Sequence, residues 1–283
     1  MTRKVLLVGL SSKLSKALRE VLWDKGQSDV FTVSLRDIRD PVQHLVGLIE
    51  LNGITSVVYF SVVSNEQPLG SSAETIEDIN VRIPTALAKF CCKAGVAFVA
   101  FSSTRVFNEK ESFYKSNSPY SPTTNYGRSK VRLEDGVLSS GGTVIRLSKV
   151  LAPTDELFAE WNMFARNPDE YKVEIFRNVY IAPIFPVEVA RAVEFVLNES
   201  SEEQIFQFSR QSEFSYEELF GMFLELGDQN HDGNKSLIGA TIKESPKAHA
   251  SLECDRKLEY FLGNFSEQFS DLIEESANYL PRK

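Results

Sequence analysis

The chain has 283 residues, of which 42% are hydrophobic and 25% are charged, and its formal net charge is -8. This length suffices for one large α/β domain, or for a domain with a smaller lobe. The acidic balance argues against nucleic acid and anionic membranes as partners, and no apolar run approaches the roughly 20 residues that cross a bilayer.

The N-terminal apolar run VLLVGL is too short for a secretory signal, and no small-residue cleavage site follows it. We therefore expect a buried first strand and a cytoplasmic protein. Neither the cysteines nor the three histidines have metal-ligand spacing, and an odd number of cysteines makes no disulfide framework. The cysteines are Cys91, Cys92 and Cys254. We predict buried thiols and no metal site.

Apolar runs alternate with helical patterns over the first half of the chain. The runs typical of buried strands are KVLLVGL (4–10), DVFTVSL (29–35), TSVVYFSVV (55–63), VAFVAFSS (96–103) and GGTVIRLS (141–148). The segments with helical spacing are 13–26, 41–53, 72–95 and 126–138. Continuous apolar strands that alternate with helices predict a doubly wound parallel sheet of the Rossmann type, which binds ligands at the carboxyl ends of its strands.

The pattern loosens after about residue 150. Helices are indicated at 157–168, 186–200, 215–227 and 266–280, with strands within 173–185 and 204–209. Pro186 suits a first helical turn, and Ser215 and Glu218 have the spacing of a capping box.

The first glycine turn has lost two of the three glycines of the dinucleotide fingerprint. Gly9 follows the first strand directly, while Ser12 and Ser15 occupy the other two positions. Serine is small, and its hydroxyl can donate to a phosphate beside the amides of a helix N-terminus. A turn with one glycine also occurs in folds that bind no nucleotide. We predict that a dinucleotide contacts this turn at Gly9, Ser11, Ser12 and Leu14.

The end of the second strand, VSLRD, bears on the choice of cofactor. An acidic residue there would bind the ribose diol of NAD, but the chain has Ser34, Leu35 and then Arg36. Arg36 favours a 2′-phosphate, and so NADP(H) over NAD(H). A solvated surface arginine is the alternative, and Asp37 would reverse the preference.

The stretch SPTTNYGRSK (121–130) places Tyr126 and Lys130 four residues apart at the start of a helix, where such pairs share one face. A free tyrosine has a pKa of about 10. A cation about 4 Å away, at an effective dielectric of about 20, contributes roughly 4 kcal/mol, or about three pKa units. Tyr126 is therefore predicted to give a proton to a carbonyl oxygen that receives hydride. Such a pair alone is common on helices.

Hydroxyls at the end of the fourth strand strengthen this interpretation. The stretch FSSTRVF offers Ser102, Ser103 and Thr104 at the edge where an open sheet places its ligands. One of them would hydrogen-bond the oxygen on which negative charge develops.

In this order the motifs VLLVGLSSKLS, RDIRDP, VVYFSVV, SSTRVF and SPTTNYGRSK resemble the extended short-chain dehydrogenases/reductases. The chain is most similar to the dTDP-4-dehydrorhamnose reductase branch of sugar-nucleotide enzymes. The resemblance runs over nearly the whole chain. It implies a catalytic triad of Ser103, Tyr126 and Lys130. It also implies cofactor contacts from Asp37, Ile38, Phe60, Ser61 and Asn80, of which Phe60 and Ser61 replace two alanines.

Three departures from the family pattern matter. The phosphate turn has lost two glycines, which bears on affinity for the dinucleotide. Lys115 and Ser116 lie where the family has a glutamate before the tyrosine helix, and the loop after SSTRVF has no glycine, which suggests a substrate other than the rhamnose precursor. Arg146 fits a family position, although a structural arginine is an equal interpretation.

We expect a dinucleotide-binding core over residues 1–150, to which 177–200 returns, and a smaller α/β substrate-binding lobe over most of 151–283. The expected reaction is reduction of a 4-keto nucleotide-activated sugar, with hydride from the nicotinamide and a proton from Tyr126. A turn that releases its cofactor favours net reduction. Alternatives are a sugar-nucleotide epimerase or dehydratase, a reductase of a non-sugar carbonyl, and a non-catalytic regulatory subunit. A homodimer is compatible with these patterns.

Overall fold

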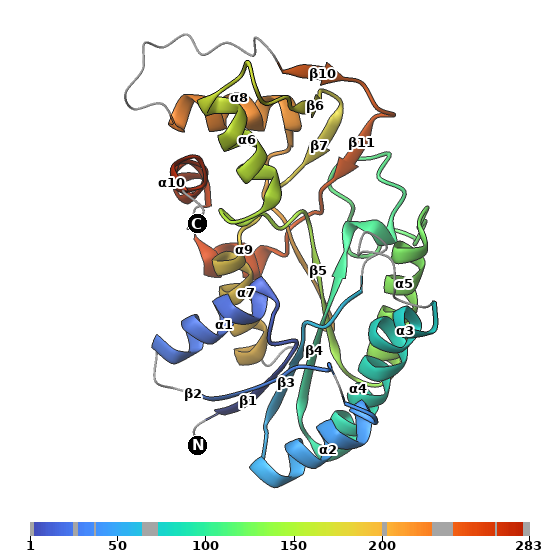
Figure 1. Cartoon of the computed structure of the whole chain (residues 1–283). Coiled ribbons are helices and arrows are strands. Elements are labelled where there is room, and N and C mark those ends of the chain that lie inside the picture. Colours follow the sequence, from blue (N-terminus) through green and yellow to red (C-terminus); the bar gives the residue numbers. More distant parts are fainter. Residues whose placement is uncertain are drawn as a thin grey trace.

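The structure is a computed structural model that describes residues 3–24, 28–36, 38–63, 73–199, 203–227, 240–263 and 265–279. Its largest unit is a six-stranded sheet of order β2-β1-β3-β4-β5-β8, in which all neighbours are parallel (Figure 1). The strands are β1 (Arg3–Val8), β2 (Ser28–Val33), β3 (Ser56–Tyr59), β4 (Ala97–Ser103), β5 (Thr143–Leu147) and β8 (Ile205–Phe208). Because β2 and β3 lie on opposite sides of β1, the ligand crevice of such a sheet lies between the carboxyl ends of β1 and β3.

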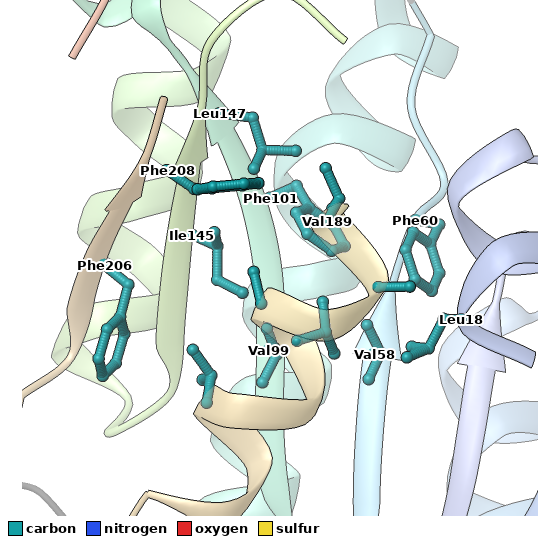
Figure 2. Close-up of a cluster of buried hydrophobic side chains, with 14 of the residues drawn as sticks. Leu18, Val58, Phe60, Val99, Phe101, Ile145, Leu147, Val189, Phe206 and Phe208 are labelled. Atoms are coloured by element: carbon teal, nitrogen blue, oxygen red, sulfur yellow. The ribbon is translucent and has the colours of Figure 1, made fainter. Parts of the chain in front are cut away.

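Helices cover both faces of this sheet. One face carries α1 (Lys13–Asp24) and α7 (Pro186–Asn198), and the other carries α2 (Pro41–Asn52), α4 (Ile83–Ala94) and α5 (Asn125–Ser139) (Figure 1). The strands are buried on both sides, since residues of β4 alternate between two core clusters. Figure 2 shows the first cluster, where Val99 and Phe101 of β4 lie beside Val189 of α7. The predicted doubly wound sheet is confirmed.

The long helix predicted over 72–95 is interrupted. The short helix α3 (Ala73–Glu77) passes through a π-helical turn, η1 (Asp78–Arg82), before α4 begins. Pro84 explains the break, because proline has no N–H to donate to the Asn80 carbonyl four residues earlier, and its ring crowds that oxygen. The turn leaves the Asn80 side chain buried beside the loop after β3.

The C-terminal lobe lies beyond the carboxyl ends of the large sheet (Figure 1). Its elements are α6 (Glu156–Arg166), β6 (Glu174–Phe176), β7 (Val179–Ile181), β9 (Phe214–Ser215), α8 (Tyr216–Gly227), β10 (Thr241–Lys243), β11 (Ala248–Ala250) and α10 (Phe265–Asn278). Strand β10 pairs with β6, and β7 lies between β11 and β9. Aromatic rings fill the lobe, with the centroid of Trp161 lying 5.0 Å from that of Phe220 and 5.3 Å from that of Phe223.

The chain returns from the lobe to the core through α7 and then β8, which follow one another along the chain. Strand β8 lies beyond the segment 177–200 that the sequence pattern singled out. A further short helix, α9 (Arg256–Leu262), packs on α7 through Leu258 and Leu262. The capping box at the start of α8 is confirmed, since Ser215 N donates to the Glu218 carboxylate at 2.7 Å and Glu218 N donates to Ser215 Oγ at 3.1 Å.

A buried ion pair fixes helix α5 against the sheet. Arg146 on β5 is 1% exposed and Glu134 on α5 is fully buried, and the guanidinium donates to this carboxylate through Nε at 3.0 Å and Nη2 at 2.7 Å. Arg146 Nη1 also donates to the Ser116 carbonyl and to Gln207 Oε1. The arginine thus joins α5, β5, β8 and the loop before α5, which favours the structural interpretation of Arg146 that the sequence left open.

A close backbone contact fixes the start of α5. Thr124 Oγ1 caps the helix by accepting from Gly127 N at 3.0 Å. A Cβ built on Gly127 would overlap the carbonyl oxygen of Arg105, in the short 3-10 turn η2 (Thr104–Val106) that follows β4. Residue 127 must therefore be glycine for α5 to begin where it does.

We predict that Arg146→Ala lowers the free energy of unfolding by about 3–5 kcal/mol, because it leaves the buried Glu134 carboxylate without its charge partner. The control is Arg132→Ala. It removes the same charge from the surface of α5, where Arg132 forms a half-exposed ion pair with Glu77 of α3. That loss should stay below about 1 kcal/mol. Urea unfolding measures both, and equal losses would contradict the structural role.

We predict that Gly127→Ala destabilises the protein by about 1–3 kcal/mol, because the Arg105 backbone must shift to admit a methyl group. Gly221→Ala in the middle of α8 is the matched control, since a Cβ there meets no atom within 4 Å. It should be neutral or stabilising by up to about 1 kcal/mol. Thermal unfolding of the two variants would refute the packing argument if Gly127→Ala were the more stable one.

Candidate active site

The turn after β1 keeps its glycine for a backbone reason. Gly9 has φ +115, and a Cβ there would lie 3.0 Å from Ser61 N, in the segment that follows β3. The turn is held to β2 by a hydrogen bond from Gly9 N to the Val33 carbonyl at 2.8 Å. The serine at the third glycine position, Ser15, is buried on α1, so a small side chain suffices for this helix to pack closely.

A cavity of about 260 Å³ opens at the edge where β1, β3 and β4 end; we call it the sheet-edge cavity. Eight of the predicted site residues line it: Ser12, Leu14, Phe60, Ser61, Asn80, Ser103, Tyr126 and Lys130. Lys13, Tyr59, Val62, Phe101, Ser102, Leu133, Leu147, Ser148 and Val150 complete the lining. The N-terminus of α1 thus borders the cavity, as an anion at a helix start requires.

The remaining predicted residues lie elsewhere. Gly9 and Ser11 form the turn behind the cavity without lining it. Arg36 is exposed after β2 and Ile38 is half-buried, and neither lines the cavity. Asp37 lies outside the described residues.

Asn80 is held by the backbone. Its Oδ1 accepts from Val63 N at 2.9 Å and its Nδ2 donates to the Val63 carbonyl at 2.8 Å. Phe60 stacks on Phe101, with ring centroids 4.9 Å apart (Figure 2). Both residues therefore build the wall of the sheet-edge cavity.

Tyr126 and Lys130 lie together as the spacing predicts. The ammonium of Lys130 is 5.6 Å from the centroid of the Tyr126 ring. The lysine is only 5% exposed and donates to the Phe101 carbonyl on β4 at 2.8 Å. Burial lowers the pKa of Lys130 to about 8, and Glu134 partly opposes this shift. The ammonium is thus still largely charged at pH 7.

Two serines end β4 beside this pair. Ser103 Oγ accepts from Arg105 N at 3.3 Å and so caps η2. Ser102 is buried, and its hydroxyl has no hydrogen-bond partner among the described residues. Since buried hydroxyls are nearly always paired, this one fits a polar atom of a bound ligand.

A second cavity, of about 660 Å³, lies between the core and the lobe; we call it the lobe cavity. Its core side is lined by Ser103, Thr104, Arg105, Glu109, Thr124, Tyr126, Ser148, Lys149 and Val150, and its lobe side by Val179, Tyr180, Ile181, Tyr216, Ser245, Ala248 and Ala250. Ser103, Tyr126, Ser148 and Val150 line both cavities. Tyr126 therefore stands at the junction of two clefts, one under the phosphate turn and one under the lobe.

Sequence reasoning missed several residues of these cavities. Lys13 donates to both carboxylate oxygens of Asp155, at 2.8 and 2.7 Å, and so joins the start of α1 to the start of α6. Ser148 donates to the Ala182 carbonyl at 2.5 Å. Arg105 and Glu109 form an ion pair beside the lobe cavity. Only the motif SSTRVF, which contains Arg105, hinted at any of them.

Among the residues that the structure describes, no group of three or more His, Cys, Asp or Glu side chains is arranged to hold a metal ion. Nor does this part of the chain contain a helix long and apolar enough to cross a membrane.

Comparisons with known proteins find solved structures of the same fold. The structure of a dTDP-4-dehydrorhamnose reductase from Clostridium acetobutylicum is 15% identical, with a TM-score of 0.78 over 96% of this chain and 98% of the other. A reductase of the same name from Bacillus anthracis, in complex with NADP, is 13% identical, with a TM-score of 0.77 over 97% of each chain. A dTDP-glucose 4,6-dehydratase from Bacillus anthracis, in complex with NAD, is 13% identical, with a TM-score of 0.78 over 97% of this chain and 95% of the other.

At these identities the likeness shows the fold. Among curated proteins, the sequence has no match. A family described as "RmlD substrate binding domain" matches residues 3–241, which is most of the chain. This agrees with the resemblance found in the sequence: the chain belongs to the RmlD substrate binding domain family.

Proposed function

We propose that this protein is an NAD(P)H-dependent reductase of a 4-keto nucleotide-activated sugar. The observation that carries the proposal is the place of Tyr126 and Ser103 in both cavities, with the Lys130 ammonium against the tyrosine ring. A proton donor for a carbonyl must reach both the hydride source and the substrate. Tyr126 and Ser103 line both the sheet-edge cavity and the lobe cavity, and so meet this requirement.

The sheet-edge cavity fits a nicotinamide dinucleotide. Its lining includes the N-terminus of α1 and the Ser102 hydroxyl, which has no hydrogen-bond partner among the described residues, and the Gly9 turn lies directly behind it. Ser12 and Leu14 would contact the pyrophosphate end, and Ser103, Tyr126 and Lys130 the nicotinamide end. When bound, the cofactor supplies the hydride. Arg36, exposed directly after β2, supports NADP(H) as the preferred form.

The chain's own residues handle the proton. Tyr126 donates its phenolic proton to the carbonyl oxygen of the substrate, which becomes an alcohol. The Lys130 cation stabilises the phenolate that remains. Ser103 donates a hydrogen bond to the same oxygen and so stabilises the charge that develops there. The lobe, over most of residues 151–283, holds the nucleotide sugar while the core with its returning segment holds the cofactor.

The lost glycines favour a net reductase over an epimerase or a dehydratase. Ser12 replaces one glycine at the start of α1, so the approach of a pyrophosphate to the backbone is less close than a glycine permits. Weaker retention suits an enzyme that must exchange oxidised for reduced cofactor in each turnover. An epimerase keeps its cofactor bound between turnovers, so weaker retention of the cofactor offers it no advantage.

We predict that Tyr126→Phe leaves NADPH affinity within about twofold and lowers turnover by about 10²–10⁴-fold, the range of general acid catalysis. NADPH fluorescence measures binding, and NADPH oxidation with dTDP-4-keto-6-deoxyglucose measures turnover. Tyr260→Phe is the control, since Tyr260 is 90% exposed. Lys130→Met should weaken both binding and turnover. Full activity of Tyr126→Phe would assign the proton to another group. No NADPH binding by the wild type at millimolar concentration would favour a regulatory subunit.

We predict that turnover falls as the pH rises through about 8, the pKa of buried Lys130. An ordinary lysine keeps its proton to about 10.4, but burial brings the loss of this charge into the measurable range. Above pH 8 the neutral amine no longer stabilises the phenolate, so the rate declines. A pH profile of kcat measures this, with Lys130→Arg as the comparison, because arginine stays charged. An unchanged alkaline limb in that variant would exclude Lys130 as its source.

A further inference from the structure

The lobe cavity contains a charged pair that the reductase chemistry does not use. Arg105, two residues after Ser103, donates through Nη1 to Glu109 Oε2 at 2.6 Å. The arginine side chain is 49% exposed, whereas that of Glu109 is 11% exposed. Both residues line the lobe cavity, but the Arg105 side chain is half-exposed while that of Glu109 is largely buried.

The chain accepts a strained backbone to place Glu109 there. Glu109 has φ +58, in the left-handed region that is unfavourable for a non-glycine residue. Its carbonyl accepts from His249 N at 2.8 Å, which ties this turn to β11 of the lobe. The strain persists because the neighbouring backbone holds it, as it does at many ligand sites.

The Glu109 carboxylate compensates Arg105 incompletely. Burial raises the pKa of Glu109, while Arg105 and the Thr104 side chain lower it to a smaller extent. Its second oxygen, Oε1, is buried and has no hydrogen-bond partner among the described residues. Glu109 therefore holds the guanidinium in place from behind. Within that part of the chain it is the only hydrogen-bond partner of the guanidinium, so most of the five N–H donors remain for a ligand.

The charge of the lobe cavity also favours an anionic ligand. Its charged lining residues are Arg105, Lys149 and Glu109, two cations and one anion, although the chain as a whole carries -8. A cleft with a net positive lining on an acidic protein attracts anionic ligands. Guanidinium binds the paired oxygens of phosphate and carboxylate in a forked geometry.

We propose that Arg105, positioned by Glu109, is an anion-binding subsite of the lobe cavity that determines substrate specificity. It takes an anionic oxygen group of the substrate, either a phosphate of the nucleotide or a carboxylate on the sugar. The subsite rests on the proposed function in that the anion belongs to the substrate that Tyr126 protonates. Arg105 does not itself take part in the proton transfer.

The test measures binding of UDP-glucose, dTDP-glucose and UDP-glucuronic acid by calorimetry, without turnover. Arg105→Gln should weaken all three by more than about tenfold if the anion is a phosphate. It should selectively weaken UDP-glucuronic acid if the anion is a carboxylate. Arg105→Lys, which keeps the charge but not the fork, should lie in between. Arg128→Gln, the same loss of charge at an exposed position outside both cavities, should leave all three unchanged.

Glu109→Gln is expected to raise the affinity for the anionic probes, whereas Arg105→Gln lowers it. The amide keeps the shape behind Arg105 and removes the competing negative charge, so anionic probes should bind more tightly. A purely structural role for Glu109 would weaken them, together with NADPH. NADPH affinity within about twofold of the wild type shows that each variant is folded.

Two results would overturn the subsite: unchanged affinity for all three probes in Arg105→Gln, or no binding of any of them to the wild type. Neither depends on catalysis. If the probes behave as expected but no keto sugar is reduced, the reductase proposal fails and the subsite stands. If NADPH is oxidised normally while Arg105→Gln changes no affinity, the subsite fails and the reductase remains.

Discussion

The hydrogen bond from the Lys130 ammonium to the Phe101 carbonyl, 2.8 Å long and buried, is the contact on which the candidate active site depends. It joins helix α5 to strand β4. Through it the phenol of Tyr126, one turn earlier on α5, and the hydroxyl of Ser103, two residues later on β4, are held in one register. By accepting this hydrogen bond, the carbonyl also offsets part of the cost of burying an ammonium.

The second constraint is the buried pair of Arg146 and Glu134, one turn further along α5. A lone buried carboxylate would be destabilising there, and the arginine neutralises its charge. The same guanidinium also hydrogen-bonds β8 and the loop before α5, and so joins them to β5. The Glu134 charge also raises the pKa of Lys130 and so helps to keep the ammonium protonated. The same helix therefore carries Tyr126, the proposed proton donor, the Lys130 cation beside it and the Glu134 anion that supports the cation.

Much of this fold could be predicted from the sequence, because its physical causes are local. Continuous apolar runs such as 96–103 mark strands buried on two faces, and the spacing of Tyr126 and Lys130 fixes their common face. The π-helical turn before Pro84 and the pairing of β8 with β5 in the large sheet were missed. The first depends on one missing N–H within a strong helical pattern, and the second on pairing between residues about sixty positions apart. Glu109 and Asp155 could not be foreseen, because their partners Arg105 and Lys13 become neighbours only through turn geometry and the closure of the lobe.

The contact between Gly127 and the Arg105 carbonyl makes the position of helix α5 independent of the side chain at residue 105. An enzyme often has to change what it binds without moving its reactive groups. The contact uses only main-chain atoms of residue 105, so the side chain there can be exchanged without loosening the start of α5. Residue 127, by contrast, admits glycine alone. A scaffold built in this way can diversify what it recognises while the tyrosine next to that glycine keeps its position.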